Sequence, residues 1–249
     1  MDFEGRTAIV TGAARGIGRG TVIKLAARGA NVVIADIDYG VAKELEDRLT
    51  AQGYAAMAVE VDVKSVDVLQ SMVKKTVERF GSVDILFNNA GIFHKTPIED
   101  ITEEEWDNMS AINLKSVFFA TQAVLPYMKE KGYGRIVNMS SFSGRSGGIS
   151  NGLAYSATKA GILGLSKGFA SRLCGTGINV NAIAPGSTDT GILDGLNDAE
   201  MKNLMMKIPM GRFARTEEVV DAVLFLCSQE ASFITGAILD VNGGMYCPS

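Results

Sequence analysis

The chain has 249 residues, of which 47% are hydrophobic and 21% are charged, a composition that is ordinary for a globular protein. Its net charge of −4 argues against a nucleic acid or an anionic membrane as partner, because both favour a basic surface. No apolar run approaches the roughly 20 residues that span a bilayer, and the first residues lack the pattern of a signal peptide. Three scattered cysteines and one histidine indicate neither a disulfide framework nor a metal site, so we expect a metal-free cytoplasmic protein.

Short apolar runs alternate with helical patterns along the whole chain. Runs rich in valine and isoleucine predict strands buried on both faces, at residues 7–12, 31–36, 55–63, 83–91, 134–141, 178–186 and 236–244. Helical patterns follow at residues 18–30, with Gly29 as a stop, at 66–81, and at 102–132, where Thr102 and Glu105 predict a capping box. The alternation predicts one α/β domain over residues 1–249, a doubly wound Rossmann fold whose seven-stranded parallel sheet carries helices on both faces.

The first predicted strand leads into a glycine-rich turn, VTGAARGIG, at residues 10–18. Gly12, Gly16 and Gly18 permit a tight turn, close approach of the backbone to a pyrophosphate, and tight packing of the next helix. The amino end of that helix offers free N–H groups to phosphates. Asp36 ends the second strand, where a carboxylate can accept both ribose hydroxyls. This part of the chain therefore predicts dinucleotide binding.

A tyrosine and a lysine stand one helical turn apart in the stretch GLAYSATKAG, residues 152–161. Alone, Tyr155 and Lys159 could be a surface pair. In order along the chain, however, the glycine turn, NNAG at 88–91 and YSATK at 155–159 resemble the short-chain dehydrogenase/reductase family. The resemblance covers essentially the whole chain, from GRTAIVTG to LDVNGG.

The resemblance implies roles for four catalytic residues. Tyr155 would be the general acid/base, and Lys159 would lower its pKa from about 10 and hold the nicotinamide ribose. Ser141 would hydrogen-bond the substrate oxygen, because the family places this serine three residues before a glycine; Ser140 or Ser143 is the alternative. Asn113 would kink its helix and hold a water that links Lys159 to solvent, or else simply lie on a polar helix face.

The resemblance also implies a set of cofactor and substrate contacts. In the family pattern, Asn89 would brace the sheet, Asp62 would contact the adenine ring, and Thr188 and Thr190 would hold the nicotinamide carboxamide. The cofactor-binding residues would be Gly12, Arg15, Gly16, Ile17, Gly18, Asp36, Ile37, Asp62, Val63, Asn89, Ala90, Gly91, Tyr155, Lys159, Pro185, Gly186, Thr188 and Thr190. Residues 187–212 would form a substrate lid with an apolar face or pack in the ordinary way on the core. The substrate contacts would be Ser141, Ser143, His94 and Leu193, although a lone loop histidine such as His94 is more often solvated.

We therefore expect an NAD-dependent oxidoreductase that interconverts a secondary alcohol and a ketone. Sugars, polyols, hydroxysteroids and small hydroxy compounds are all open as its substrate. The alternative within the family is a 3-oxoacyl-[acyl-carrier-protein] reductase using NADPH. Asp36 disfavours NADP, although Arg15 could pair with its phosphate, and Thr176 stands where those reductases often carry an arginine. A dinucleotide sensor without catalysis is a third reading. The family commonly forms dimers and tetramers, so we expect a homo-oligomer.

Overall fold

The computed structural model describes residues 1–148, 152–190 and 197–247, and its main feature is a seven-stranded parallel sheet. The strand order is β3-β2-β1-β4-β5-β6-β9. The strands are β1 (Thr7–Thr11), β2 (Asn31–Asp36), β3 (Ala56–Glu60), β4 (Ile85–Asn88), β5 (Gly134–Met139), β6 (Ile178–Pro185) and β9 (Ile238–Val241). Each of the seven predicted runs contains one of these strands. The order changes direction between β1 and β4, the switch point at which such sheets bind ligands.

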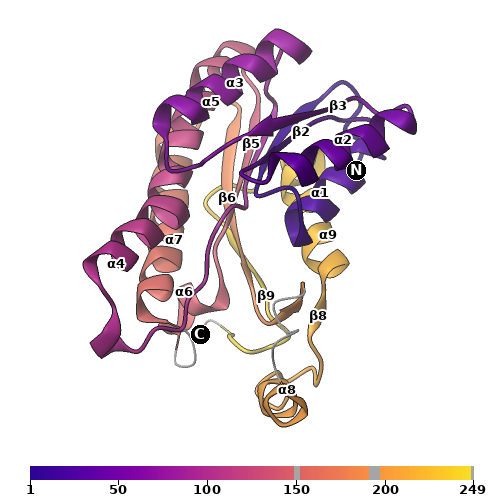
Figure 1. The fold of residues 1–249 in the computed structure, drawn as a ribbon. Helices are drawn as coiled ribbons and strands as arrows, with labels where there is room; N and C mark the ends of the chain where they lie inside the picture. Colours follow the sequence, from indigo (N-terminus) through magenta and orange to yellow (C-terminus); the bar gives the residue numbers. More distant parts are fainter. Residues whose placement is uncertain (149–151, 191–196, 248–249) are drawn as a thin grey trace.

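Helices cover both faces of the sheet (Figure 1). One face carries α1 (Gly16–Ala26), α2 (Tyr39–Ala51) and α9 (Thr216–Cys227); the other carries α3 (Val66–Phe80), α5 (Ser116–Lys131) and α7 (Leu153–Leu173). Side chains of β1 alternate between the two cores: Val10 packs in the first and Ile9 in the second. This arrangement confirms the predicted doubly wound fold. In the part of the chain that is described, no helix is both long and apolar enough to cross a membrane.

The helix predicted at residues 102–132 is interrupted. It consists of α4 (Glu103–Ser110), a π-helical turn (Ala111–Lys115) and α5. The Thr102 hydroxyl caps α4 by accepting a hydrogen bond from the N–H of Glu105. The second half of the predicted capping box is wrong, because the Glu105 carboxylate instead accepts a hydrogen bond from the Thr96 hydroxyl at 2.7 Å. Glu105 thus ties α4 to the preceding loop, which begins at the carboxyl end of β4.

The predicted lid segment holds short elements at the carboxyl-end edge of the sheet. They are β7 (Thr188–Asp189), which pairs with β8 (Ala214–Arg215), and α8 (Asp198–Met205). Figure 1 shows α8 standing apart from the two helical layers. Leu193 lies outside the described residues. The described elements that remain are the short helix α6 (Phe142–Ser146) and two 3-10 turns (Ile98–Asp100 and Gln229–Ala231).

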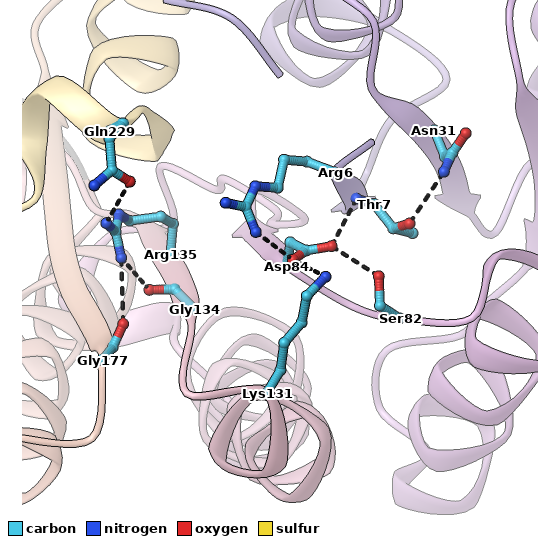
Figure 2. A network of polar contacts seen from close by, with 10 residues as sticks. All are labelled: Arg6, Thr7, Asn31, Ser82, Asp84, Lys131, Gly134, Arg135, Gly177 and Gln229. Carbon is cyan, nitrogen blue, oxygen red and sulfur yellow. Dashed lines mark hydrogen bonds and ion pairs between the residues drawn. The ribbon is translucent and has the colours of Figure 1, made fainter. Parts of the chain in front are cut away.

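A polar network ties the strands together at the opposite, amino-end edge of the sheet (Figure 2). The Asp84 carboxylate, fully buried just before β4, accepts hydrogen bonds from the side chains of Arg6, Ser82 and Lys131 and from the N–H of Thr7. Burial alone would raise the pKa of Asp84, but these donors outweigh it and hold the pKa below its usual value. A single carboxylate therefore joins the beginning of β1 to the end of α5.

Arg135 extends this polar network to the next strands of the sheet, β5 and β6. Its guanidinium donates to the carbonyls of Gly134, Gly177 and Ser228 and to the Gln229 side chain, as Figure 2 shows in part. The Tyr133 ring lies 4.5 Å from the Arg135 guanidinium and 3.7 Å from that of Arg6. The amino-end edge is thus closed by side chains, and the carboxyl-end edge is left for the candidate site.

Candidate active site

The glycine turn after β1 is shaped by contacts that exclude side chains. Gly12 has φ +61°, and a Cβ there would lie 2.8 Å from the Cα of Ala90. A Cβ at Gly18 would lie 2.3 Å from the carbonyl oxygen of Gly12. At Gly16, in contrast, the nearest atom to such a Cβ is the Thr190 Cβ at 3.8 Å, so the turn borders open space on this side. The backbone can therefore approach a ligand closely at the amino end of α1.

A groove of about 420 Å³ runs from this turn along the carboxyl ends of β2, β3 and β4. Its lining contains nine of the predicted cofactor residues: Gly12, Arg15, Asp36, Ile37, Asp62, Val63, Asn89, Ala90 and Gly91. It also contains Val61, Lys64, Ile92, Asn108 and Ile112, which the sequence did not single out. Val61, Lys64 and Ile92 directly adjoin predicted residues. Asn108 and Ile112 come from the interrupted helix, in which only the kink at Asn113 was expected.

Asn89 links the fourth strand to the glycine turn. Its side-chain amide donates to the carbonyls of Thr11 and Gly12 at 3.0 and 2.8 Å. In return the Thr11 hydroxyl accepts hydrogen bonds from the N–H groups of Asn89 and Ala90. These four bonds fix the width of the groove at the switch point. Thr11 was visible in the sequence as part of the motif, but its role becomes clear only from this pairing.

Acidic groups surround the far end of the groove. The Asp36 carboxylate accepts hydrogen bonds from the N–H of Ala14 at 2.9 Å and from the N–H of Asp38 at 3.0 Å. A carboxylate has about four acceptor sites, so two remain for ribose hydroxyls. Asp38, which the sequence reasoning missed, forms an ion pair with Arg15 at 2.7 Å. The sequence cue for Asp38 was its place just before a helical segment, where aspartate is a favoured N-cap. In the structure it does cap α2, because its carboxylate accepts a hydrogen bond from the N–H of Val41.

Tyr155 and Lys159 lie on the first turns of α7. The Lys159 ammonium is buried, donates to the carbonyl of Met139 at 2.8 Å and lies 5.6 Å from the centre of the Tyr155 ring. Burial lowers the pKa of Lys159 to about 8. Burial also raises the pKa of Tyr155, while a hydrogen bond with the Ser141 side chain acts in the opposite direction. The expected lowering of the Tyr155 pKa is thus not found in the protein alone, because desolvation of the phenolate dominates.

Ser140, Ser141 and Ser143 were the candidate serines after β5, and the side chain of Ser141 hydrogen-bonds Tyr155. Ser141 also caps α6, since its hydroxyl accepts the N–H of Ser143 at 3.1 Å. The Ser140 hydroxyl instead donates to the carbonyl of Lys159 at 2.8 Å. Ser143 is fully buried in α6. The structure therefore brings Ser141 to the tyrosine, whereas the Ser140 hydroxyl is bound to the backbone of α7.

Helix α6 packs directly against the backbone of α7. A Cβ at Gly144 would lie 2.7 Å from the carbonyl carbon and oxygen of Lys159 and 2.9 Å from the N of Ala160. Glycine is needed at this position because no side-chain atom fits between the helices. The contact sets the distance between the cap of α6, which is Ser141, and the turn of α7 that carries Tyr155.

Asn113 lies in the π-helical turn between α4 and α5 and is completely buried. Its amide accepts a hydrogen bond from the N–H of Ile92 at 2.8 Å and donates to the Ile92 carbonyl at 3.0 Å and the Thr158 hydroxyl at 3.3 Å. A single inserted residue widens a helix into such a turn, which is the expected kink in a specific form. Asn113 thus joins the loop after β4 to α7; the water relay stays a prediction.

His94 is half-exposed in the loop after β4, and its Nδ1 lies 3.6 Å from a carboxylate oxygen of Glu105. The structure therefore pairs His94 with the first turn of α4. Of the two roles considered for His94, substrate contact and a solvated loop histidine, this contact agrees with the second.

The residues present fit a bound dinucleotide. Thr190 has a buried hydroxyl that finds no hydrogen-bond partner within the described residues, and a bound amide group could satisfy such a hydroxyl. Its Cβ borders the open side of Gly16. At Gly91, a Cβ would lie 3.2 Å from the Asn113 amide oxygen and 3.4 Å from the Lys159 ammonium, so glycine keeps this end of the groove open. Among the side chains that are described, no group of His, Cys, Asp and Glu is arranged to hold a metal ion.

The chain is similar along nearly its whole length to known oxidoreductases. The family model described as enoyl-(acyl carrier protein) reductase matches residues 12–246. The chain is 41% identical over 248 residues to the 3-oxoacyl-[acyl-carrier-protein] reductase FabG of Escherichia coli (strain K12), covering 99% of each chain, and 39% identical over 251 residues to the FabG of Thermotoga maritima, covering 98% of this chain and 99% of the relative. The crystal structure of gox2181 superimposes with a TM-score of 0.93 at 35% identity, covering 98% of this chain and 96% of the other. The chain therefore belongs to the short-chain dehydrogenase/reductase family of oxidoreductases.

Proposed function

We propose that the chain reduces the ketone of a 3-oxoacyl thioester to the 3-hydroxyacyl product, and oxidises that product in reverse. The observation that carries the reaction class is the hydrogen-bonded pair of Ser141 and Tyr155 beside the buried ammonium of Lys159. The substrate class is supported by relatives named as 3-oxoacyl reductases, which match the chain along nearly its whole length. This assignment replaces the general alcohol or ketone substrate expected from the sequence.

The geometry divides the chemistry among three side chains. The Ser141 hydroxyl hydrogen-bonds the ketone oxygen and orients it, as oxyanion stabilisers do. The Tyr155 hydroxyl gives its proton to that oxygen while negative charge develops on it, so one O–H bond breaks on the enzyme as another forms on the product. Lys159 is protonated below about pH 8 and stabilises the phenolate that remains. A reduced nicotinamide, when bound, supplies the hydride that reaches the carbonyl carbon.

Residues of the groove and around it support an assignment of each part of the dinucleotide. The glycine turn would hold the pyrophosphate and Asp36 the adenosine ribose. Thr190 would hold the carboxamide with its hydroxyl, which has no partner among the described residues, and Lys159 would hold the nicotinamide ribose.

We infer a preference for NAD(H), because Asp36 would repel the 2′-phosphate of NADP(H). Two unit charges about 4 Å apart at an effective dielectric near 20 repel by roughly 4 kcal/mol, and even a fraction of this gives a preference above tenfold. The kcat/KM values for NADH and NADPH with one substrate test the inference, and Asp36→Ala should shrink or invert their ratio. Equal or better use of NADPH by the unaltered enzyme would contradict it.

A substrate panel tests the proposed reaction. Purified protein is assayed by dinucleotide absorbance with a short 3-oxoacyl thioester of coenzyme A, the matching 3-oxoacyl ethyl ester, a polyol and a hydroxysteroid. We expect the thioester to give the highest kcat/KM. An inert thioester alongside rapid oxidation of the polyol or steroid would refute the proposal.

Rapid oxidation of the polyol or the steroid, with an inert thioester, would instead support a second candidate function, an NAD-dependent secondary alcohol dehydrogenase. Two observations favour it: carboxylates of Asp36 and Asp38 stand at the adenosine end of the groove, and Thr176 occupies the turn before β6 where carrier-protein reductases often have an arginine. The Thr176 hydroxyl is bonded to the carbonyl of Leu173 at 2.6 Å and presents no positive charge to a carrier protein.

A further inference from the structure

We propose that Asp38 is a specificity-determining residue, which holds the Arg15 guanidinium away from a 2′-phosphate and thereby favours NAD(H) over NADP(H). The proposal rests on the dinucleotide binding of the proposed function, but not on its substrate. It concerns a residue that lies two positions beyond Asp36 and outside the glycine motif.

The ion pair stands where a 2′-phosphate would arrive. Arg15 lines the groove from the turn before α1, and Asp38 follows Ile37, which lines it from the turn after β2. Hydrogen bonds from the N–H groups of Ala14 and Asp38 to Asp36 draw these two turns together around the carboxylate expected to bind the ribose. A phosphate on that ribose would therefore lie within reach of the Arg15 side chain.

Arg15 is already engaged at this position. Its Nη2 lies 2.7 Å from Oδ2 of Asp38, and the Arg15 side chain is 68% exposed, so it extends over the surface toward α2. The hydrogen bond from Arg15 holds the pKa of Asp38 below its usual value, which keeps the carboxylate charged at neutral pH. A phosphate could use Arg15 only by breaking this pair or by approaching the Asp38 charge.

The other basic residue of the groove lining is matched in the same way. The Lys64 ammonium lies 3.8 Å from a carboxylate oxygen of Asp62. Each cation of the lining thus stands beside an aspartate, and Asp36 adds a further negative charge. The adenosine end of the groove offers hydrogen-bond acceptors for hydroxyls and no unpaired cation among its described lining residues.

The two oxygens of Asp38 have separate partners, which makes a clean substitution possible. Oδ1 accepts the N–H of Val41 and caps α2, while Oδ2 pairs with Arg15. Asparagine caps helices as well as aspartate does. Asp38→Asn therefore removes the charge and keeps the helix cap.

The test is a direct binding titration of NADH and NADPH, followed by dinucleotide fluorescence without substrate. We expect Asp38→Asn to lower the Kd of NADPH relative to that of NADH by about two- to fivefold, since an exposed ion pair makes a modest contribution. Asp47→Asn is the matched control: it makes the same charge change on the same helix, in a residue paired with Lys43. Its Kd ratio should equal that of the wild type.

Each outcome bears on the proposal. A double variant, Arg15→Ala with Asp38→Asn, should lose the gain, because the released arginine is the group that binds the phosphate. An unchanged ratio in Asp38→Asn, a gain that persists in the double variant, or an equal gain in Asp47→Asn would each overturn the proposal. A failed substrate assignment leaves this titration intact, whereas a wild type that binds neither dinucleotide overturns both proposals.

Discussion

Replacing Gly144 by alanine tests whether Ser141 owes its position to the contact between α6 and α7. The new Cβ would lie 2.7 Å from backbone atoms of Lys159, whereas ordinary van der Waals contact begins at 3.4 Å. The helices must therefore separate by about 0.7 Å, the difference between these two values. The obstructing atoms are backbone of the 21-residue helix α7, so the five-residue helix α6 is the element that moves.

Movement of α6 carries its cap residue, Ser141, away from Tyr155. A misplacement of about 1 Å at reacting groups can cost on the order of 10²-fold in rate. We therefore expect Gly144→Ala to lower kcat by about ten- to a hundredfold. The Kd for the dinucleotide should stay within about twofold, because the residues lining the groove do not belong to α6. Steady-state kinetics and a fluorescence titration measure the two quantities.

Gly164→Ala is the matched control. Gly164 lies in α7, and no atom would come within 4 Å of a Cβ there. This variant should keep full activity and gain up to about 1 kcal/mol of stability, since alanine favours helix. Circular dichroism confirms that both variants fold. A folded Gly144→Ala protein with kcat within twofold of the wild type, or with dinucleotide affinity reduced as much as kcat, would refute the reasoning.

The other predictions concern single side chains. Tyr155→Phe should keep dinucleotide binding and lose at least about 10²-fold in kcat, and near-normal turnover would remove Tyr155 from the mechanism. The rate of 3-hydroxyacyl oxidation should rise with pH as Tyr155 ionises, and Lys159→Met should move that midpoint upward, because the cation that favours the phenolate is gone; an unmoved midpoint contradicts this. Asp84, whose pKa is lowered on folding, contributes stability above its unfolded pKa of about 3.9 that is lost in more acidic solution. Asp84→Asn should therefore destabilise by on the order of 1.5–3 kcal/mol at pH 7, since the Arg6 and Lys131 side chains that remain are partly exposed, and it should flatten the acid limb of a plot of Tm against pH. An unchanged Tm would argue against a stabilising role of the Asp84 network.

Much of the fold could be predicted because a parallel sheet buried on both faces leaves a clear pattern of apolar runs. The kink at Asn113 was expected only from the family resemblance, and local spacing carries no signal for the turn at Ala111–Lys115, because that turn depends on hydrogen bonds between Asn113 and Ile92, which lie 21 positions apart. Local spacing at residues 102–132 favours one continuous helix. The unusual turn forms because the fold brings the loop after β4 against that helix.

The candidate site was predictable where its members share a motif. Tyr155 and Lys159 lie on one helical turn, and parallel strands bring Asp36, Asn89 and Ser141 to one edge of the sheet. Contacts that use backbone, such as the Met139 carbonyl bound to Lys159, leave no signal in the sequence. Pairs between distant side chains, such as Arg15 with Asp38, become visible only once the turns are placed. The homo-oligomer stays a prediction, which light scattering would check.

The central position of β1 has a consequence for the order in which the chain can fold. β1 is synthesised before the other six strands of this sheet, yet it pairs with β4, and its Thr7 is bonded to Asp84 across 77 positions. Pairing at such separation requires a large loop to close, and the entropy cost of closing it comes before the favourable contacts form, which slows folding. Until the ribosome has delivered residues 84–88, the apolar β1 therefore has β2 as a neighbour but no partner on its other side. We expect the nascent chain to depend on chaperones during this interval, when its unpaired edge is open to aggregation.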